Sequence, residues 1–290
     1  MSGATEPPGA EIMSTVGIDG GWAQGLRTRI IFGLLMAVIA VAAIVSGDRV
    51  FAMFVGVAAV ILAWEWTRLC GENRFGRTGL FVALAMLAVV LMAFLDRLPL
   101  ALAGTMLAAL LAFVSARAGS RANPFWIGAG VIYVGVPVAS LIWLRGHDAS
   151  GERMIFWLLT SVAMTDIGAY FAGRLIGGPK LAPRISPKKT WAGLIGAMIA
   201  SAAIGIGFAH FDNSAPATGI LAAAGACIAV VGQAGDLLES AVKRRFGVKD
   251  SSGLIPGHGG LLDRVDGLIV AAAALAFFQW TTAGSVLAWR

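Results

Sequence analysis

The segment Ser240–Gly267 gathers charged and polar side chains between two strongly apolar stretches. Its sequence, SAVKRRFGVKDSSGLIPGHGGLLDRVDG, holds five cations, three aspartates and a histidine with a glycine on each side. Charged groups at this density could bind a charged ligand, or could relay ions through a membrane. Gly257, Gly259 and Gly260 would let the backbone approach a ligand closely, although glycine clusters also commonly mark turns.

The apolar stretch before this segment contains an acidic side chain. Asp236, Glu239, Ser240, Lys243 and Arg244 are spaced at offsets 0, 3, 4, 7 and 8, which places them on one face of a helix. If Lys243 marks the membrane surface, Asp236 lies roughly 10 Å deeper at the helical rise. An ionisable group at that depth costs about 2.5–3.5 kcal/mol, so it must face a polar cavity or a partner. A structural ion pair with a neighbouring helix is the alternative.

Two further carboxylates, Asp263 and Asp266, are three residues apart at the start of the next apolar stretch. Acidic residues at a helix N-terminus often only complement the helix dipole. That explanation accounts for both carboxylates, but not for their position opposite a basic loop and beside another intramembrane acid.

The elements that hold these residues must lie in a membrane. The chain of 290 residues is 58% hydrophobic and only 13% charged, with a mean hydropathy of +0.81, whereas a soluble domain is about a quarter charged. Cys70 and Cys227 are isolated, so neither a disulfide framework nor a zinc site is indicated. We therefore expect an all-α, polytopic helical bundle.

The hydropathy pattern predicts about nine transmembrane helices. Residues 1–28 are expected to form a flexible cytoplasmic tail, and residues 29–290 a single membrane-embedded bundle. With roughly 17–25 apolar residues per span, the predicted spans are 29–46, 50–67, 79–95, 98–115, 126–144, 153–173, 190–208, 217–241 and 266–286.

Positive charge predicts the orientation, because short cytoplasmic loops carry the excess of Lys and Arg. With alternating spans, one side collects all but five of the 22 Lys and Arg residues. The five exceptions are Arg49, Arg97, Arg145, Arg153 and Arg290. The N-terminus and the segment Ser240–Gly267 are therefore expected inside the cell, and the C-terminus outside.

The polar segment resembles the signature of the phosphatidate cytidylyltransferases, also called CDP-diacylglycerol synthases. The residues that carry the resemblance are Ser240, Lys243-Arg244, Lys249-Asp250, Pro256, His258-Gly259-Gly260, Asp263-Arg264 and Asp266. A second block, SPKKTWAG at residues 186–193, is similar to one in the same family, and Asp166 lies nearby as another intramembrane carboxylate.

The resemblance implies that phosphatidic acid attacks CTP, giving CDP-diacylglycerol and pyrophosphate. Both reactants are anions, so catalysis is mainly charge neutralisation and positioning. One Mg²⁺ ion or two would be held by carboxylates. The first choices for these ligands are Asp236 and Asp263, and the second choices are Asp266 and Asp166.

The cations would divide between the substrates: those of the polar segment on the CTP phosphates, and Lys188 and Lys189 on the lipid head group, at about 1 kcal/mol each. His258 would orient a phosphate or accept a proton, with a turn-stabilising role as the alternative. The resemblance implies Asp236, Asp263, Lys249 and Arg264 as catalytic residues. It implies Ser186, Lys188, Lys189, Thr190, Ser240, Lys243, Arg244, His258, Gly259 and Gly260 as substrate-binding residues.

Two other functions stay open. A related enzyme that uses CTP, such as a polyprenol kinase or an archaeal-type lipid cytidylyltransferase, would differ in its products. A transporter could use Asp166, Asp236 and Asp263 as a relay, although the sequence lacks the internal repeat of many transporters. We expect a multi-pass protein of the bacterial inner membrane with its active site facing the cytoplasm. Its partners would be CTP, phosphatidic acid and bilayer lipid, with no nucleic acid, and a homodimer is left open.

Overall fold

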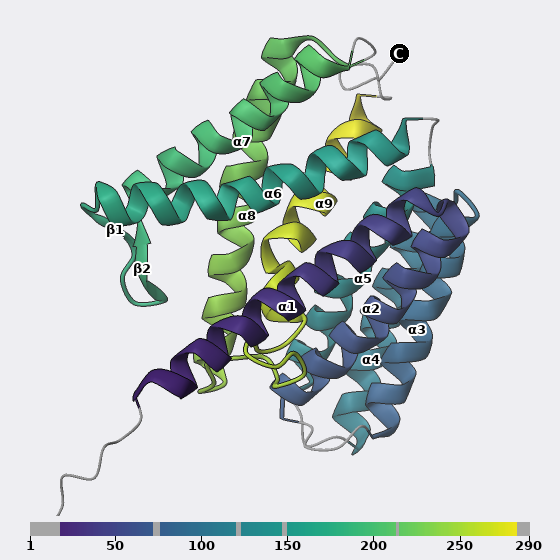
Figure 1. Ribbon diagram of the computed structural model, residues 1–290. Coiled ribbons are helices and arrows are strands. Elements are labelled where there is room, and N and C mark those ends of the chain that lie inside the picture. The colour runs from purple at the N-terminus through teal and green to yellow at the C-terminus, as the bar shows by residue number, and fades with distance from the viewer. Residues whose placement is uncertain (1–17, 72–75, 120–122, 147–149, 213–214, 283–290) are drawn as a thin grey trace, which may run out of the picture.

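The computed structural model describes residues 18–71, 76–119, 123–146, 150–212 and 215–282, and these form helices and one short hairpin (Figure 1). The helices are α1 (Ile18–Val45), α2 (Asp48–Leu69), α3 (Arg77–Phe94), α4 (Leu98–Gly119), α5 (Pro124–Gly146), α6 (Gly151–Leu175), α7 (Trp191–Phe211), α8 (Thr218–Arg245) and α9 (Leu262–Thr281). The strands are β1 (Lys180–Ala182) and β2 (Ser186–Thr190).

The helical prediction is confirmed, since every predicted span corresponds to one of these helices. Two details differ. Helix α1 begins at Ile18, within the segment expected to be tail, while residues 1–17 lie outside the described part. The segment between α6 and α7 is not a plain loop, because β1 and β2 pair in an antiparallel hairpin.

Seven of the described helices, α2 to α8, are long and apolar enough to cross a membrane. The apolar part of α1, Ile30–Val45, is shorter, and α9 begins with charged residues. The count of nine spans therefore stays a prediction. Many large apolar side chains on the outer faces of α1, α3 and α4, such as Leu34, Leu84 and Leu107, are exposed. Apolar surface of this extent is typical of contact with lipid, and the chain is a multi-pass membrane protein.

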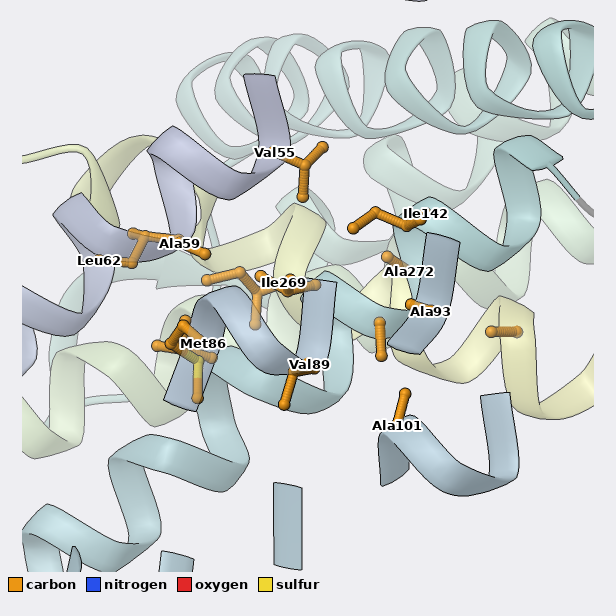
Figure 2. Close-up of a cluster of buried hydrophobic side chains, with 14 of the residues drawn as sticks. Val55, Ala59, Leu62, Met86, Val89, Ala93, Ala101, Ile142, Ile269 and Ala272 are labelled. Carbon is orange, nitrogen blue, oxygen red and sulfur yellow. The ribbon is translucent and has the colours of Figure 1, made fainter. Parts of the chain in front are cut away.

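Helix α9 lies between two groups of helices. Helices α2 to α5 pack together on one side, and α6, α7 and α8 pack in sequence on the other (Figure 1). Ile269 and Ala272 of α9 belong to the same buried cluster as Leu62 of α2 and Met86 of α3 (Figure 2). The helix that begins with Asp263 is thus held by the core of the protein.

The ends of the helices meet in two sets. At one end, the buried Arg145 of α5 binds Asp48 at the start of α2, with 2.6 Å between Nη1 and Oδ1, and donates to the backbone oxygen of Ile44 at 3.0 Å. At the other end, Glu65 of α2 contacts the start of α9. This second end contains the residues of the polar segment.

Candidate active site

A tight turn brings the polar segment back to the start of α9. The Ile255 amide donates to the Gly259 carbonyl at 2.8 Å, and the His258 amide donates to the Ile255 carbonyl at 2.9 Å. Pro256 and Gly257 occupy the two central positions, and Gly257 has φ +78°. Proline followed by a left-handed glycine is the pattern of a type II turn. The positive φ that this turn requires therefore explains why a glycine occupies position 257.

Asp263 organises the loop that precedes it. Its Oδ1 lies 2.6 Å from the ammonium of Lys243 on α8. Its Oδ2 accepts from the Gly260 amide at 2.8 Å, and from both the amide and the hydroxyl of Ser251 at 2.9 Å. The Asp263 side chain is only 4% exposed. Its role as a metal ligand stays a prediction, but the contacts in the structure are those of a loop-holding residue.

Three other carboxylates form a compact acidic group. Asp236 and Glu239 of α8 and Asp266 of α9 each offer an oxygen, and these oxygens lie within 4.8 Å of one another. Lys243 contacts Glu239 at 2.6 Å, while Glu239 Oε1 is buried without a hydrogen-bond donor among the described residues. Carboxylate oxygens are the ligands that Mg²⁺ prefers, so the donor set and the orphaned oxygen fit this ion.

Asp166 of α6 borders the same acidic group. It interacts electrostatically with Asp236, and Asp266 interacts with both. Asp166 is not one of the carboxylates of the compact group, and its role as a metal ligand stays a prediction.

The hairpin between α6 and α7 brings a second cation to this group. The ammonium of Lys189 lies 2.5 Å from Asp236 Oδ2 and donates to the Gln233 carbonyl at 3.4 Å. The neighbouring Lys188 is exposed, as expected where successive side chains of a strand point to opposite faces. Lys189 from the hairpin before α7 and Lys243 from the end of α8 thus contact the same acidic group.

Comparison with known proteins identifies the family. The model of the cytidylyltransferase family matches residues 27–282. The chain belongs to the cytidylyltransferase family. It is 40% identical over 257 residues to a phosphatidate cytidylyltransferase of Brucella suis, covering 88% of this chain and 93% of the relative. It is 37% identical over 268 residues to a phosphatidate cytidylyltransferase of Pseudomonas aeruginosa, covering 88% and 97%. The resemblance noted in the sequence is confirmed.

Other predicted substrate-binding residues of this cytidylyltransferase have local contacts. Ser240 donates to Asp236 Oδ1 at 3.3 Å, at the edge of the acidic group. Arg244 is exposed and donates to the Val248 carbonyl at 3.0 Å. Thr190 is buried, and its hydroxyl accepts from the Gly193 amide at 3.0 Å, so it caps the N-terminus of α7.

The remaining predicted residues lie around the same end of the bundle. Ser186 begins β2 beside the turn of the hairpin, where it pairs with Ala182 of β1. Lys249 and Arg264 are exposed on the polar segment and on the first turn of α9. His258 is half-buried in the turn, and its Nδ1 has no hydrogen-bond partner within the described part of the chain. A Cβ atom added at Gly259 would lie against Asp263, and one added at Gly260 would lie against Ser251 and against Glu65 of α2.

Sequence reasoning missed two acidic residues of this family member. Glu239 was recognised on the same helix face as Asp236 but was not predicted as a ligand. Glu65 of α2 is fully buried and contacts the polar segment. A glutamate within the apolar stretch ILAWEWTRL is an intramembrane acid, and such residues are generally functional; that signal was available.

Proposed function

We propose that this chain is a phosphatidate cytidylyltransferase whose reaction takes place at the acidic group formed by Asp236, Glu239 and Asp266. The observation that carries the proposal is that two lysines contact this group, Lys189 through Asp236 and Lys243 through Glu239. A group of carboxylates with lysines in contact suits a nucleoside triphosphate with bound metal, because the acids can hold the metal and the cations can hold the phosphates.

The acidic group would hold the magnesium, which supplies positive charge at the phosphate oxygens of CTP. Asp236, Glu239 and Asp266 are the ligands favoured by the geometry, and Asp166 stands beside them. Asp263 would keep the loop and Lys243 in position, a role that its four hydrogen-bonded or ionic contacts support. One ion or two can be accommodated by such a set of carboxylates.

The bond changes in the reaction are simple. An oxygen of the lipid phosphate attacks the α-phosphorus of CTP, the bond from that phosphorus to the bridging oxygen breaks, and pyrophosphate leaves with the electron pair. Because the attacking oxygen is already anionic, no strong general base is needed. Lys189, Lys249 and Arg264 would stabilise the charge that moves onto pyrophosphate, and Lys243 would act together with Asp263.

The two lysines of β2 would serve different substrates. Lys189 points to the acidic group, where the CTP phosphates would bind, and Lys188 is exposed at the end of the bundle. We propose that Lys188 attracts the phosphatidic acid head group from the inner leaflet. We also propose that the active site faces the cytoplasm, which the distribution of Lys and Arg supports. A homodimer stays a prediction.

The decisive experiment is a product assay with purified protein in mixed micelles. With CTP labelled in its α-phosphate, phosphatidic acid and Mg²⁺, we expect CDP-diacylglycerol and pyrophosphate in equal amounts. Chelation of the metal should abolish both, and Asp236→Asn should form neither. Release of CDP together with a phosphorylated lipid would instead assign kinase chemistry and overturn the proposal.

A further inference from the structure

Glu65 is an intramembrane acid that lies outside the acidic group. Its Oε1 accepts from the Ser252 hydroxyl at 2.6 Å and from the Leu261 amide at 2.8 Å. Its Oε2 accepts from the Leu262 amide at 2.7 Å and from the Ser251 hydroxyl at 3.4 Å. One carboxylate from α2 thus binds both ends of the segment that leads into α9.

The partners of Glu65 are dipoles rather than cations. The side chain is fully buried, and no Lys or Arg forms an ion pair with it among the described residues. Leu261 and Leu262 stand at the start of α9, where backbone amides lack partners within the helix and carry partial positive charge. The negative charge of Glu65 is therefore balanced by the end of the helix that bears Asp263 and Asp266.

A continuous set of contacts joins Glu65 to the acidic group. The Ser251 hydroxyl lies between the two acids, 2.9 Å from Asp263 Oδ2 and 3.4 Å from Glu65 Oε2, and its single proton serves either of them, while the Ser251 amide donates to Asp263 at 2.9 Å. Asp263 binds Lys243, and Lys243 binds Glu239. A displacement of the Ser251 segment would thus move the residue that fixes the position of Lys243.

Packing around Gly260 leaves this arrangement little freedom. A Cβ atom at Gly260 would lie 2.0 Å from Ser251 Oγ and 2.6 Å from Glu65 Oε1. The loop backbone is therefore in direct contact with the carboxylate, and the distance between α2 and the start of α9 is closely defined.

We propose that Glu65 is a positioning residue of the nucleotide site. It anchors the segment from Ser251 to Leu262 on α2 and, through Asp263 and Lys243, sets the spacing of the acidic group. The kinetic tests of this inference rest on the proposed function, because they measure how the reaction depends on CTP and Mg²⁺. It extends the site beyond the signature, because a helix of the N-terminal half becomes part of the machinery that binds CTP and metal.

The test is Glu65→Gln. The amide of this variant carries an N–H donor, and it would face the hydroxyl and amide donors that now contact the Glu65 carboxylate. The segment from Ser251 to Leu262 must therefore shift. We expect kcat/KM for CTP to fall by about tenfold or more, the range for the loss of a hydrogen bond to a charged group. The Mg²⁺ concentration for half-maximal activity should rise, while KM for phosphatidic acid stays within about twofold of the wild type, because Lys188 does not depend on Glu65.

Two other variants separate positioning from general stability. Asp48→Asn removes a carboxylate from the same helix at the opposite end, where it binds Arg145, and should leave the CTP and Mg²⁺ dependence unchanged. Ser252→Ala removes one donor to Glu65 from a half-buried loop position. It should shift the same two parameters less, and its effect should be lost in combination with Glu65→Gln.

Hydrogen exchange gives a readout that does not depend on activity. Amides of residues 251–262 should exchange faster in Glu65→Gln than in the wild type, with little change in α3 and α4. If the wild-type protein makes no CDP-diacylglycerol but the exchange result holds, the proposed function fails and the anchoring role stands. Wild-type CTP and Mg²⁺ dependence in a folded Glu65→Gln variant, or an equal loss in Asp48→Asn, would overturn the inference.

Discussion

Lys243 of α8 and Asp263 of α9 are joined by a contact of 2.6 Å between Nζ and Oδ1, across the loop that separates the two helices. The same ammonium lies 2.6 Å from Glu239. Lys243 therefore links a loop-holding carboxylate to a carboxylate of the acidic group. Asp263 thus holds the loop, whereas Asp266, three residues later on α9, belongs to the acidic group.

We predict different consequences for Asp263→Asn and Asp266→Asn. Asp263 accepts three hydrogen bonds in addition to its ion pair, so its amide variant should lose activity and about 1–3 kcal/mol of stability. Asp266→Asn should lower kcat about a hundredfold or more through weaker metal binding, with the melting temperature nearly unchanged. Melting curves and Mg²⁺ titrations check this; a wild-type Mg²⁺ response in Asp266→Asn would remove that residue from the ligand set.

Adjacent lysines of β2 should have separable effects. Lys189→Ala removes the ion pair with Asp236 and should lower kcat/KM for CTP about ten- to a hundredfold. Lys188→Ala should raise KM for phosphatidic acid about fivefold, the equivalent of roughly 1 kcal/mol for a surface cation. Steady-state kinetics with each substrate varied in turn measures both. Equal effects of the two variants on both substrates would mean that the lysines form one shared cradle.

Two glycines of the same loop provide a matched pair. Gly260→Ala would place a methyl group against Ser251 and Glu65, whereas a Cβ at Gly253 has nothing within 4 Å. We expect Gly260→Ala to abolish measurable turnover, because the loop must move away from α2, and Gly253→Ala to retain at least about half of the activity, in line with small effects of surface substitutions. Comparable activities would show that the close packing is dispensable.

Reporter fusions check the predicted orientation. A reporter inserted near Gly178, before β1, should lie in the cytoplasm, and one fused after Arg290 should lie outside it. The prediction follows from the excess of Lys and Arg on one side. If both reporters were found on the same side, an even number of spans would separate them, and α7 to α9 would not follow the predicted alternation.

Hydropathy predicted the helices well because the position of an apolar helix can be inferred from the residues within it. The bounds of α5, for instance, differ from the predicted span 126–144 by two residues at each end, within the usual uncertainty of helix ends. The family resemblance also implied one metal site made by Asp236, Asp263, Asp266 and Asp166. In the structure Asp236 and Asp266 belong to the compact acidic group, while Asp263 holds the loop, and their roles as metal ligands stay predictions.

The missed features depend on contacts between distant segments. Glu65 binds a residue 197 positions away, and no periodicity in the sequence indicates such a pair. The inward direction of Lys189 requires knowledge that residues 186–190 form a strand, which is too short and too polar to show a clear alternation. The capping role of Thr190 was missed for a similar reason. A residue can be recognised as a helix cap only when the start of that helix is known, and α7 begins at Trp191.

The pairing of Glu65 with the start of α9 has a consequence for biosynthesis. Helix α2 leaves the ribosome and enters the membrane well before α9 is made, and chains fold from the N-terminal side as they emerge. During that interval the Glu65 carboxyl group lacks the amide and hydroxyl donors that later surround it. The early helices must therefore tolerate an acid without these partners, at a cost below the roughly 2.5–3.5 kcal/mol of a charge at the helix centre because Glu65 lies near the end of α2, and the arrival of α9 removes that cost. The insertion of α9 thus supplies the hydrogen-bond donors that Glu65 of α2 lacks until then.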